Sequence, residues 1–231
     1  MKTNYRMRRG FTLVELLVVI VIIAALAGLT APMVIRQRKK ADQTEAVNNA
    51  RQIGMALFEF ETEYGSFPDE ATSTAVHDAT DTEKVSGTAA NDRFRQMVRA
   101  GIAQSEPMFY AKAPYTKKPD GITSGAKALE KGEVGFGIIT NADGTGMSAA
   151  GNPSRPIVMA PFTTALSGEQ FDYDVYDGKA VVLKLDNSVT SIPILKTTSK
   201  VKINGKELFE KSEDSVWGTS VSPQMAYPIS K

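Results

Sequence analysis

The chain has 231 residues, of which 23% are charged and 42% hydrophobic, an ordinary balance for a globular protein. Four of its 27 basic residues precede Phe11, so the remainder is mildly acidic and offers no basic surface for nucleic acid. It has no cysteine, which excludes disulfide bonds and thiolate metal sites. Because nucleophile-elbow, phosphate-loop and zinc-protease motifs are also missing from the sequence, we expect no enzymatic activity and no organic cofactor.

A long apolar segment, residues 11–35, follows the basic N-terminus. As a helix it would span about 37 Å at ~1.5 Å per residue, which is enough to cross a hydrocarbon core of about 30 Å. One interpretation is a membrane anchor, and the other is a secretory signal whose removal would make Gly28 the first residue. Glu15 is unexpected in this segment because a carboxylate is costly at membrane depth.

Residues 8–15 read Arg-Arg-Gly-Phe-Thr-Leu-Val-Glu and lead directly into the aliphatic stretch. This pattern resembles the prepilin signal of type IV pilins and type II secretion pseudopilins. The resemblance implies that residues 1–10 are a leader, which a prepilin peptidase removes by cutting between Gly10 and Phe11. It further implies that Phe11 becomes an N-methylated terminus.

The same resemblance implies a role for Glu15 in subunit assembly. In this family a glutamate at the corresponding position is thought to neutralise the terminal amine of a neighbouring subunit as the helices pack. Glu15 lies four positions after Phe11, which is about one helical turn, and pairing would recover much of the cost of burying a charge. Pro32 matches a position where helices of the family bend, since proline removes an internal hydrogen bond.

The helix is predicted to continue through residues 36–65 as an amphipathic element. Its apolar positions recur at spacings of three and four: Val47, Ala50, Ile53, Leu57, Phe60 and Tyr64. We expect the half near Tyr64 to pack on a globular domain and the half near Ile35 to be available to other subunits. The basic residues 36–40 then lie at the membrane surface, facing either anionic lipid headgroups or Asp42 and Glu45 of adjacent subunits.

Residues 66–231 are predicted to form one α+β domain, in which a small antiparallel sheet lies against the long N-terminal helix, as in the pilin fold. Residues 68–92 read as a long surface loop, and a short helix should follow with Phe94, Met97 and Val98 on one face. Hairpin turns are predicted at Asp177-Gly178 and Asn204-Gly205. The expected strands are residues 108–111, 134–140, 156–162, 171–175 and 180–185.

Three aspartates, Asp172, Asp174 and Asp177, form the one pattern in the domain that could carry metal chemistry. Their hard carboxylate oxygens suit calcium, which major pseudopilins hold in a C-terminal loop. The pattern also fits the solvent face of an amphipathic strand that ends in a turn. The sequence therefore does not decide between a calcium site and a solvent-exposed strand face.

The predicted function is that of a structural subunit of a type II secretion pseudopilus or a type IV pilus. Its expected partners are identical or other pilin-like subunits, the prepilin peptidase, an inner-membrane assembly platform and membrane lipid. The protein would cross the bacterial inner membrane once, with its C-terminal domain in the periplasm, before it enters the filament. The alternative is a secreted or anchored binding protein, such as an adhesin, that uses its N-terminus only for export.

Overall fold

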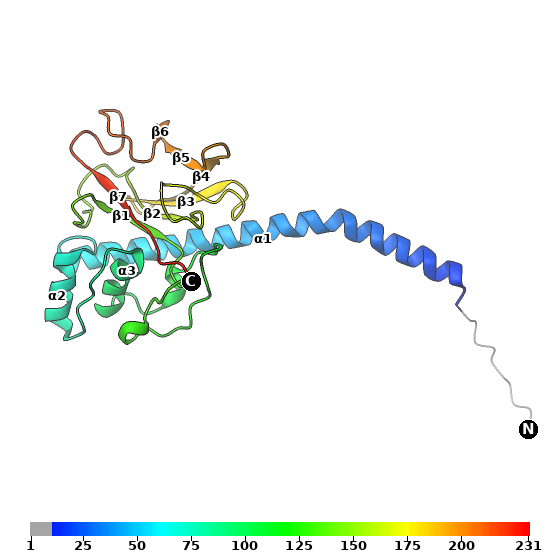
Figure 1. The fold of residues 1–231 in the computed structure, drawn as a ribbon, viewed down its shortest axis with the longest axis horizontal. Coiled ribbons are helices and arrows are strands. Elements are labelled where there is room, and N and C mark those ends of the chain that lie inside the picture. The colour runs from blue at the N-terminus through cyan, green and yellow to red at the C-terminus, as the bar shows by residue number, and fades with distance from the viewer. Residues whose placement is uncertain (1–10) are drawn as a thin grey trace, which may run out of the picture. The chain divides into compact units, whose positions relative to one another are not determined.

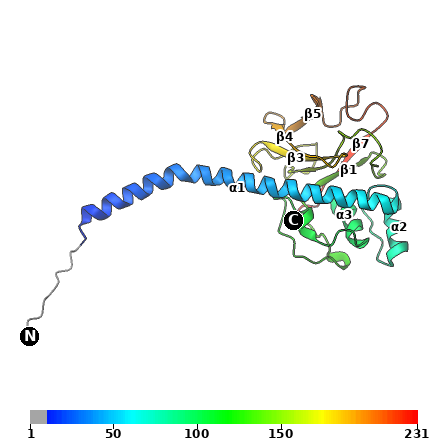
Figure 2. The ribbon, with the colours of Figure 1, turned by 180° about the vertical axis from the view of Figure 1, so that it is seen from behind.

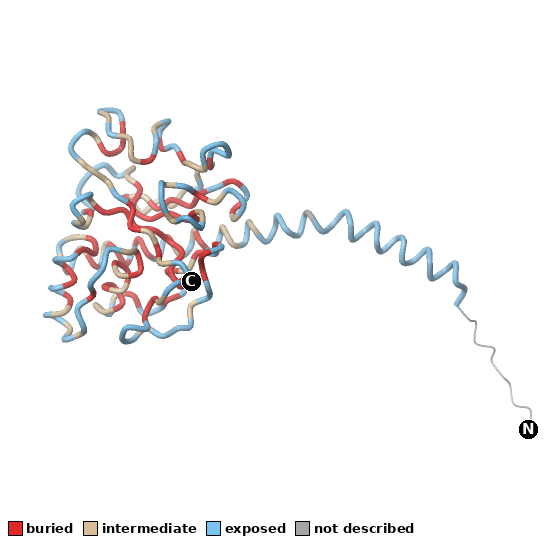
Figure 3. Tube along the Cα trace, in the orientation of Figure 1, coloured by how far each residue is buried: buried red, intermediate tan, exposed pale blue. Residues whose placement is uncertain are grey.

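The computed structural model describes residues 11–231, without the side chain of Pro32. Helix α1 runs from Leu13 to Tyr64 and crosses the boundary between two compact units, which divide after Arg38. In the first unit all the large hydrophobic side chains that are described between Phe11 and Ile35 are exposed (Figure 3). This part of α1 is long and apolar enough to cross a membrane.

The second unit, residues 39–231, is built around a seven-stranded antiparallel sheet. The strands follow one another across the sheet from β6 to β1, and β7 returns to lie beside β1 at the edge (Figure 1). Their bounds are Gly137–Asn141 (β1), Pro156–Ala160 (β2), Lys179–Lys184 (β3), Val189–Leu195 (β4), Lys200–Ile203 (β5), Lys206–Glu207 (β6) and Pro223–Ala226 (β7).

Helical elements complete this unit on the other side of α1. Figures 1 and 2 show the C-terminal part of α1 between the sheet and the short helices α2 and α3. The bounds are Glu70–Thr80 (α2), Ala90–Arg99 (α3), and the 3₁₀ helices Glu106–Phe109 (η1) and Gly125–Lys127 (η2).

The C-terminal half of α1 forms part of the domain core. Ala50, Ile53, Leu57 and Phe60 are all buried, and they are members of the stripe that the sequence predicted. Gly54 permits a close approach, because a Cβ there would lie 2.1 Å from Oδ1 of Asn187 and 3.0 Å from Cδ1 of Leu183. The low helix propensity of this glycine is therefore offset by tighter packing of α1 on β3 and the turn that follows it.

The predicted α+β, pilin-like architecture is confirmed, with a long N-terminal helix packed on an antiparallel sheet. The predicted strands at 134–140, 156–162 and 180–185 correspond to β1, β2 and β3. The Asn204-Gly205 hairpin joins β5 to β6, and both turn residues adopt positive φ, 52° and 81°. The helix predicted from Phe94, Met97 and Val98 is α3, and all three side chains are buried.

The prediction of a long loop over residues 68–92 is wrong, because α2 lies within it. The side chain of Asp69 accepts the backbone N–H of Thr72 at 2.8 Å, and Oγ1 of Thr72 accepts the N–H of Asp69 at 2.7 Å. This reciprocal cap starts a helix that has little apolar surface of its own. Hydrophobicity alone could not detect α2, whereas the Asp-x-x-Thr spacing is a local signal for it.

Two further local predictions are wrong. Residues 108–111 overlap the 3₁₀ helix η1, which has Pro107 in its first turn, so they form no strand. Residues 171–175 form a turn in which Phe171 alone makes a bridge, to Phe162, and Oδ1 of Asp172 accepts the N–H of Asp174 at 2.9 Å. Asp177-Gly178 therefore leads into β3 and does not close a hairpin. The alternating apolar and acidic residues before it belong to a turn and not to a strand.

Candidate functional site

The start of α1 is organised by Thr12 and Glu15. The carboxylate of Glu15 accepts the backbone N–H of Thr12 at 2.9 Å and its hydroxyl at 2.7 Å. The hydroxyl of Thr12 in turn accepts the N–H of Glu15 at 3.2 Å. This is a capping box, which satisfies free donors at a helix N-terminus. The Thr-x-x-Glu spacing of residues 12–15 is a sequence signal for this cap.

Phe11, the predicted N-methylated residue, lies directly before this cap and is exposed, whereas Gly10 lies outside the described residues. Glu15 is also exposed, so its carboxylate is accessible to another chain even while it caps its own helix. Phe11 therefore precedes α1, and Glu15 lies in the first turn of that helix.

The apolar part of α1 continues without interruption through position 32. The hydroxyl of Thr30 donates a hydrogen bond to the carbonyl of Leu26 at 3.0 Å. Such a bond to the preceding turn satisfies a polar side chain on an apolar helix. A bend at Pro32 stays a prediction.

The basic segment 36–40 is largely exposed. Asp42, one of its two suggested acidic partners, instead pairs within the chain with Nζ of Lys112 at 2.7 Å. Gln43 donates a hydrogen bond to the hydroxyl of Ser191 at 2.7 Å, so α1 is already attached to the domain at this level. These contacts favour lipid headgroups over Asp42 of a neighbouring subunit as the partner of the basic segment.

Comparison with known proteins agrees with the N-terminal pattern. Residues 5–31 match the family model described as the prokaryotic N-terminal methylation motif. The chain carries a prepilin-type N-terminal motif. The resemblance predicted from residues 8–15 is thereby confirmed, and the match includes Phe11, Thr12 and Glu15.

The curated relatives with significant similarity include the type II secretion system core protein G of three bacteria. Identity is 37% over 67 residues for the protein of Pectobacterium carotovorum subsp. carotovorum, which covers 29% of this chain and 42% of the relative. It is 39% over 61 residues for that of Escherichia coli K12 (26% and 42%), and 38% over 63 residues for that of Aeromonas hydrophila (27% and 44%).

The chain thus spans less than half the length of these relatives. No solved structure shows a significant match to it. The similarity covers at most 29% of this chain and leaves most of it unmatched.

The predicted calcium ligands do not converge. Within residues 11–231, Asp172, Asp174 and Asp177 are not among the carboxylates that come together in groups of three. Asp172 is instead engaged by the N–H of Asp174, and Asp177 occupies a turn with φ of 53°. The arrangement does not fit a three-carboxylate site, and calcium binding there stays a prediction. A higher melting temperature in millimolar calcium would support calcium binding, and an unchanged melting temperature would contradict it.

A different acidic group does converge within the described part of the chain. Carboxylate oxygens of Glu106, Asp120 and Glu133 lie within 4.8 Å of one another, with the two glutamates fully buried. Glu106 accepts backbone N–H groups of Gly121 and Leu129, both at 2.8 Å. Oε1 of Glu133 lies 3.3 Å from Nζ of Lys117. Through these contacts the acidic group acts as a brace, which holds together the segment between η1 and β1. No sequence motif predicted this group.

The brace predicts a pH dependence of stability. Burial raises the pKa of Glu106 above its ordinary value of 4.5, against the opposing effect of the two backbone N–H bonds. The folded protein therefore binds a proton on Glu106 more tightly than the unfolded chain does. The contribution of Glu106 to the free energy of unfolding is then largest at low pH and falls as the pH increases above about 4.5. We expect Glu106→Gln to destabilise the protein more at pH 4 than at pH 7. Urea unfolding of both proteins at the two pH values measures this, and an equal difference at both would contradict it.

Proposed function

We propose that this chain is a structural, non-enzymatic subunit of a type II secretion pseudopilus. The observation that carries the proposal is the prepilin-type motif at residues 5–31, which from Leu13 onward lies on helix α1, where the described large apolar side chains are exposed. Apolar side chains exposed over such a length need lipid or neighbouring helices around them. The similarity to type II secretion core protein G favours the pseudopilus over the type IV pilus.

The proposed sequence of events assigns a role to each of the two units. A prepilin peptidase removes residues 1–10 and methylates Phe11, while the apolar part of α1 holds the protein in the inner membrane with its C-terminal domain in the periplasm. An assembly platform then extracts the subunit into a filament with identical or other pilin-like subunits. In that filament Glu15 pairs with the terminal amine of a neighbour, and the apolar helices cover one another.

Deletion of the gene from its native host tests the proposal. A pseudopilus subunit is required for release of exported proteins, so these should accumulate in the periplasm and return to the medium when the gene is restored. Normal release together with a loss of surface filaments would instead assign the chain to a type IV pilus. Normal release with normal filaments would contradict both assignments.

A further inference from the structure

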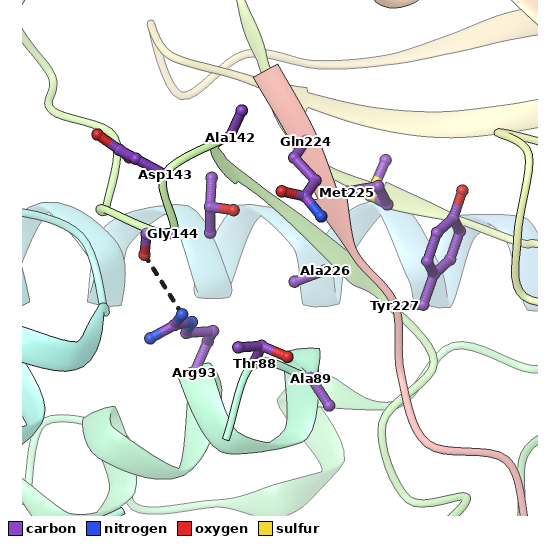
Figure 4. A pocket seen from close by; sticks show the side chains of 11 residues that line it. Thr88, Ala89, Arg93, Ala142, Asp143, Gly144, Gln224, Met225, Ala226 and Tyr227 are labelled. Atoms are coloured by element: carbon purple, nitrogen blue, oxygen red, sulfur yellow. Dashed lines mark hydrogen bonds between the residues drawn. The ribbon is translucent and has the colours of Figure 1, made fainter. Parts of the chain in front are cut away.

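A pocket of about 480 Å³ lies between the start of α3 and the edge strand β7 (Figure 4). Thr88, Ala89 and Arg93 contribute from one side, and residues 224–227 and the β1 turn at 142–144 from the other. The volume falls in the range of about 300–1,000 Å³ that is typical of small-molecule sites.

Arg93 is the unusual member of the lining. Its side chain is 3% exposed, and its Nη2 donates a hydrogen bond to the carbonyl of Gly144 at 3.3 Å. Nε and Nη1 have no hydrogen-bond partner within residues 11–231, nor does the guanidinium form an ion pair there. Buried cations are normally paired, because an isolated charge away from water is costly. A guanidinium cannot relieve that cost by losing its proton at ordinary pH.

The acidic groups around Arg93 are engaged elsewhere. Asp69 accepts N–H groups of Thr72 and Gly146, and Asp92 pairs with Arg95 at 2.9 Å. These carboxylates stabilise the guanidinium at longer range, while burial lowers the pKa of Arg93. Within the described residues, Nε and Nη1 of Arg93 therefore remain without a partner, and both are buried beside the pocket that Arg93 lines.

The lining indicates which anion fits. A guanidinium binds planar carboxylates and phosphates through paired N–H donors. Asp143 stands in the same lining and is exposed, and hydrogen bonds from Thr145 lower the pKa of its carboxylate, which keeps it ionised. One cation and one anion leave the pocket close to neutral, so a singly charged carboxylate is favoured over a doubly charged phosphate.

We propose that the Arg93 pocket binds a carboxylate presented by the C-terminus of a polypeptide. β7 supports this source, because within the described sheet it pairs with β1 alone and residues 224–227 run along the pocket. A peptide beside such an edge strand adds main-chain hydrogen bonds to the carboxylate contact. Side-chain hydroxyl and amide groups at the pocket, from Thr88 and Gln224, provide further polar partners.

Titration of the full chain in detergent micelles tests the proposal, with the Arg93 Nε–H resonance followed by ¹⁵N nuclear magnetic resonance. The probes are acetate, an N-acetylated alanine tripeptide with a free carboxylate, and the same peptide as its C-terminal amide. We expect the free-acid peptide to shift this resonance at lower concentration than acetate, and the amide to leave it unchanged. Equal affinities of acetate and peptide would overturn the polypeptide source. No shift with any carboxylate would overturn the site.

Variants provide the matched controls, with binding followed by backbone resonances of β7. Arg93→Gln should weaken peptide binding roughly tenfold or more, the usual scale for losing charge-assisted hydrogen bonds. Arg51→Gln makes the same change of charge at an exposed position on α1 and should bind as the wild type does. Thr88→Phe, at an exposed rim position, should block entry without disturbing the buried arginine. Unchanged binding in both Arg93→Gln and Thr88→Phe would contradict the proposal.

Discussion

Glu15→Ala is expected to leave leader cleavage and membrane insertion intact and to reduce filament assembly at least about tenfold. The reason is that the terminal amine of Phe11 in a neighbouring subunit would then be buried among apolar helices without its counter-charge. The cleaved subunit should accumulate in the inner membrane. Electron microscopy of sheared filaments, with immunoblots of the membrane fraction, measures both quantities.

The capping box supplies controls that separate charge pairing from helix capping. Glu15→Gln keeps an acceptor at the third helical position, which suits a capping box, but removes the charge. Thr12→Ala removes the capping hydroxyl and keeps the charge. If Glu15 acts by pairing, Glu15→Gln should fail as Glu15→Ala does, Glu15→Asp should be partly defective, and Thr12→Ala should assemble. Normal filaments in Glu15→Gln would mean that the Glu15 carboxylate only caps α1 and does not pair with a neighbouring subunit.

Phe60→Ala is expected to lower the stability of the protein by about 3–5 kcal/mol. Phe60 lies on the buried face of α1 with 0% exposure, and its ring centroid is 4.7 Å from that of Tyr64. Truncation would leave a cavity where the helix meets the rest of the core. For a domain of this size the melting temperature should fall by roughly 6–20 °C, since each kcal/mol corresponds to about 2–4 °C.

Met55→Ala is the matched control on the same helix. Met55 is 54% exposed, so its replacement should change stability by no more than about 0.5 kcal/mol. Thermal unfolding of both full-length variants in the same detergent gives the comparison. Similar melting temperatures for Phe60→Ala and the wild type would mean that the C-terminal half of α1 is not part of the cooperative core.

Strong periodicity and local turn chemistry account for what could be predicted from the sequence. The three-and-four spacing from Ala50 to Phe60 located the buried face of α1, because a helix of that length can bury only one stripe. The Asn204-Gly205 turn was predictable since both residues tolerate positive φ. The prepilin-type motif was recognisable because its chemistry depends on a short contiguous stretch.

The remainder depends on contacts between distant segments. β4 buries only Ile194 and carries Pro193, so its place beside β3 is set by pairing and leaves little trace in hydrophobicity. β7 pairs with β1, which lies more than 80 residues earlier in the chain. Burial of Arg93 and Glu106 likewise follows from tertiary packing, and neither residue stands within a motif that distinguishes it from a surface charge.

We propose that this chain is processed and assembled as a prepilin-type subunit. Intact-mass spectrometry of the protein purified from its native membrane tests the processing step. We expect a chain that begins at Phe11 with one additional methyl group, and Gly10→Val should leave residues 1–10 attached. A mature chain that begins at Gly28, or one that keeps its first ten residues in the wild type, would contradict it.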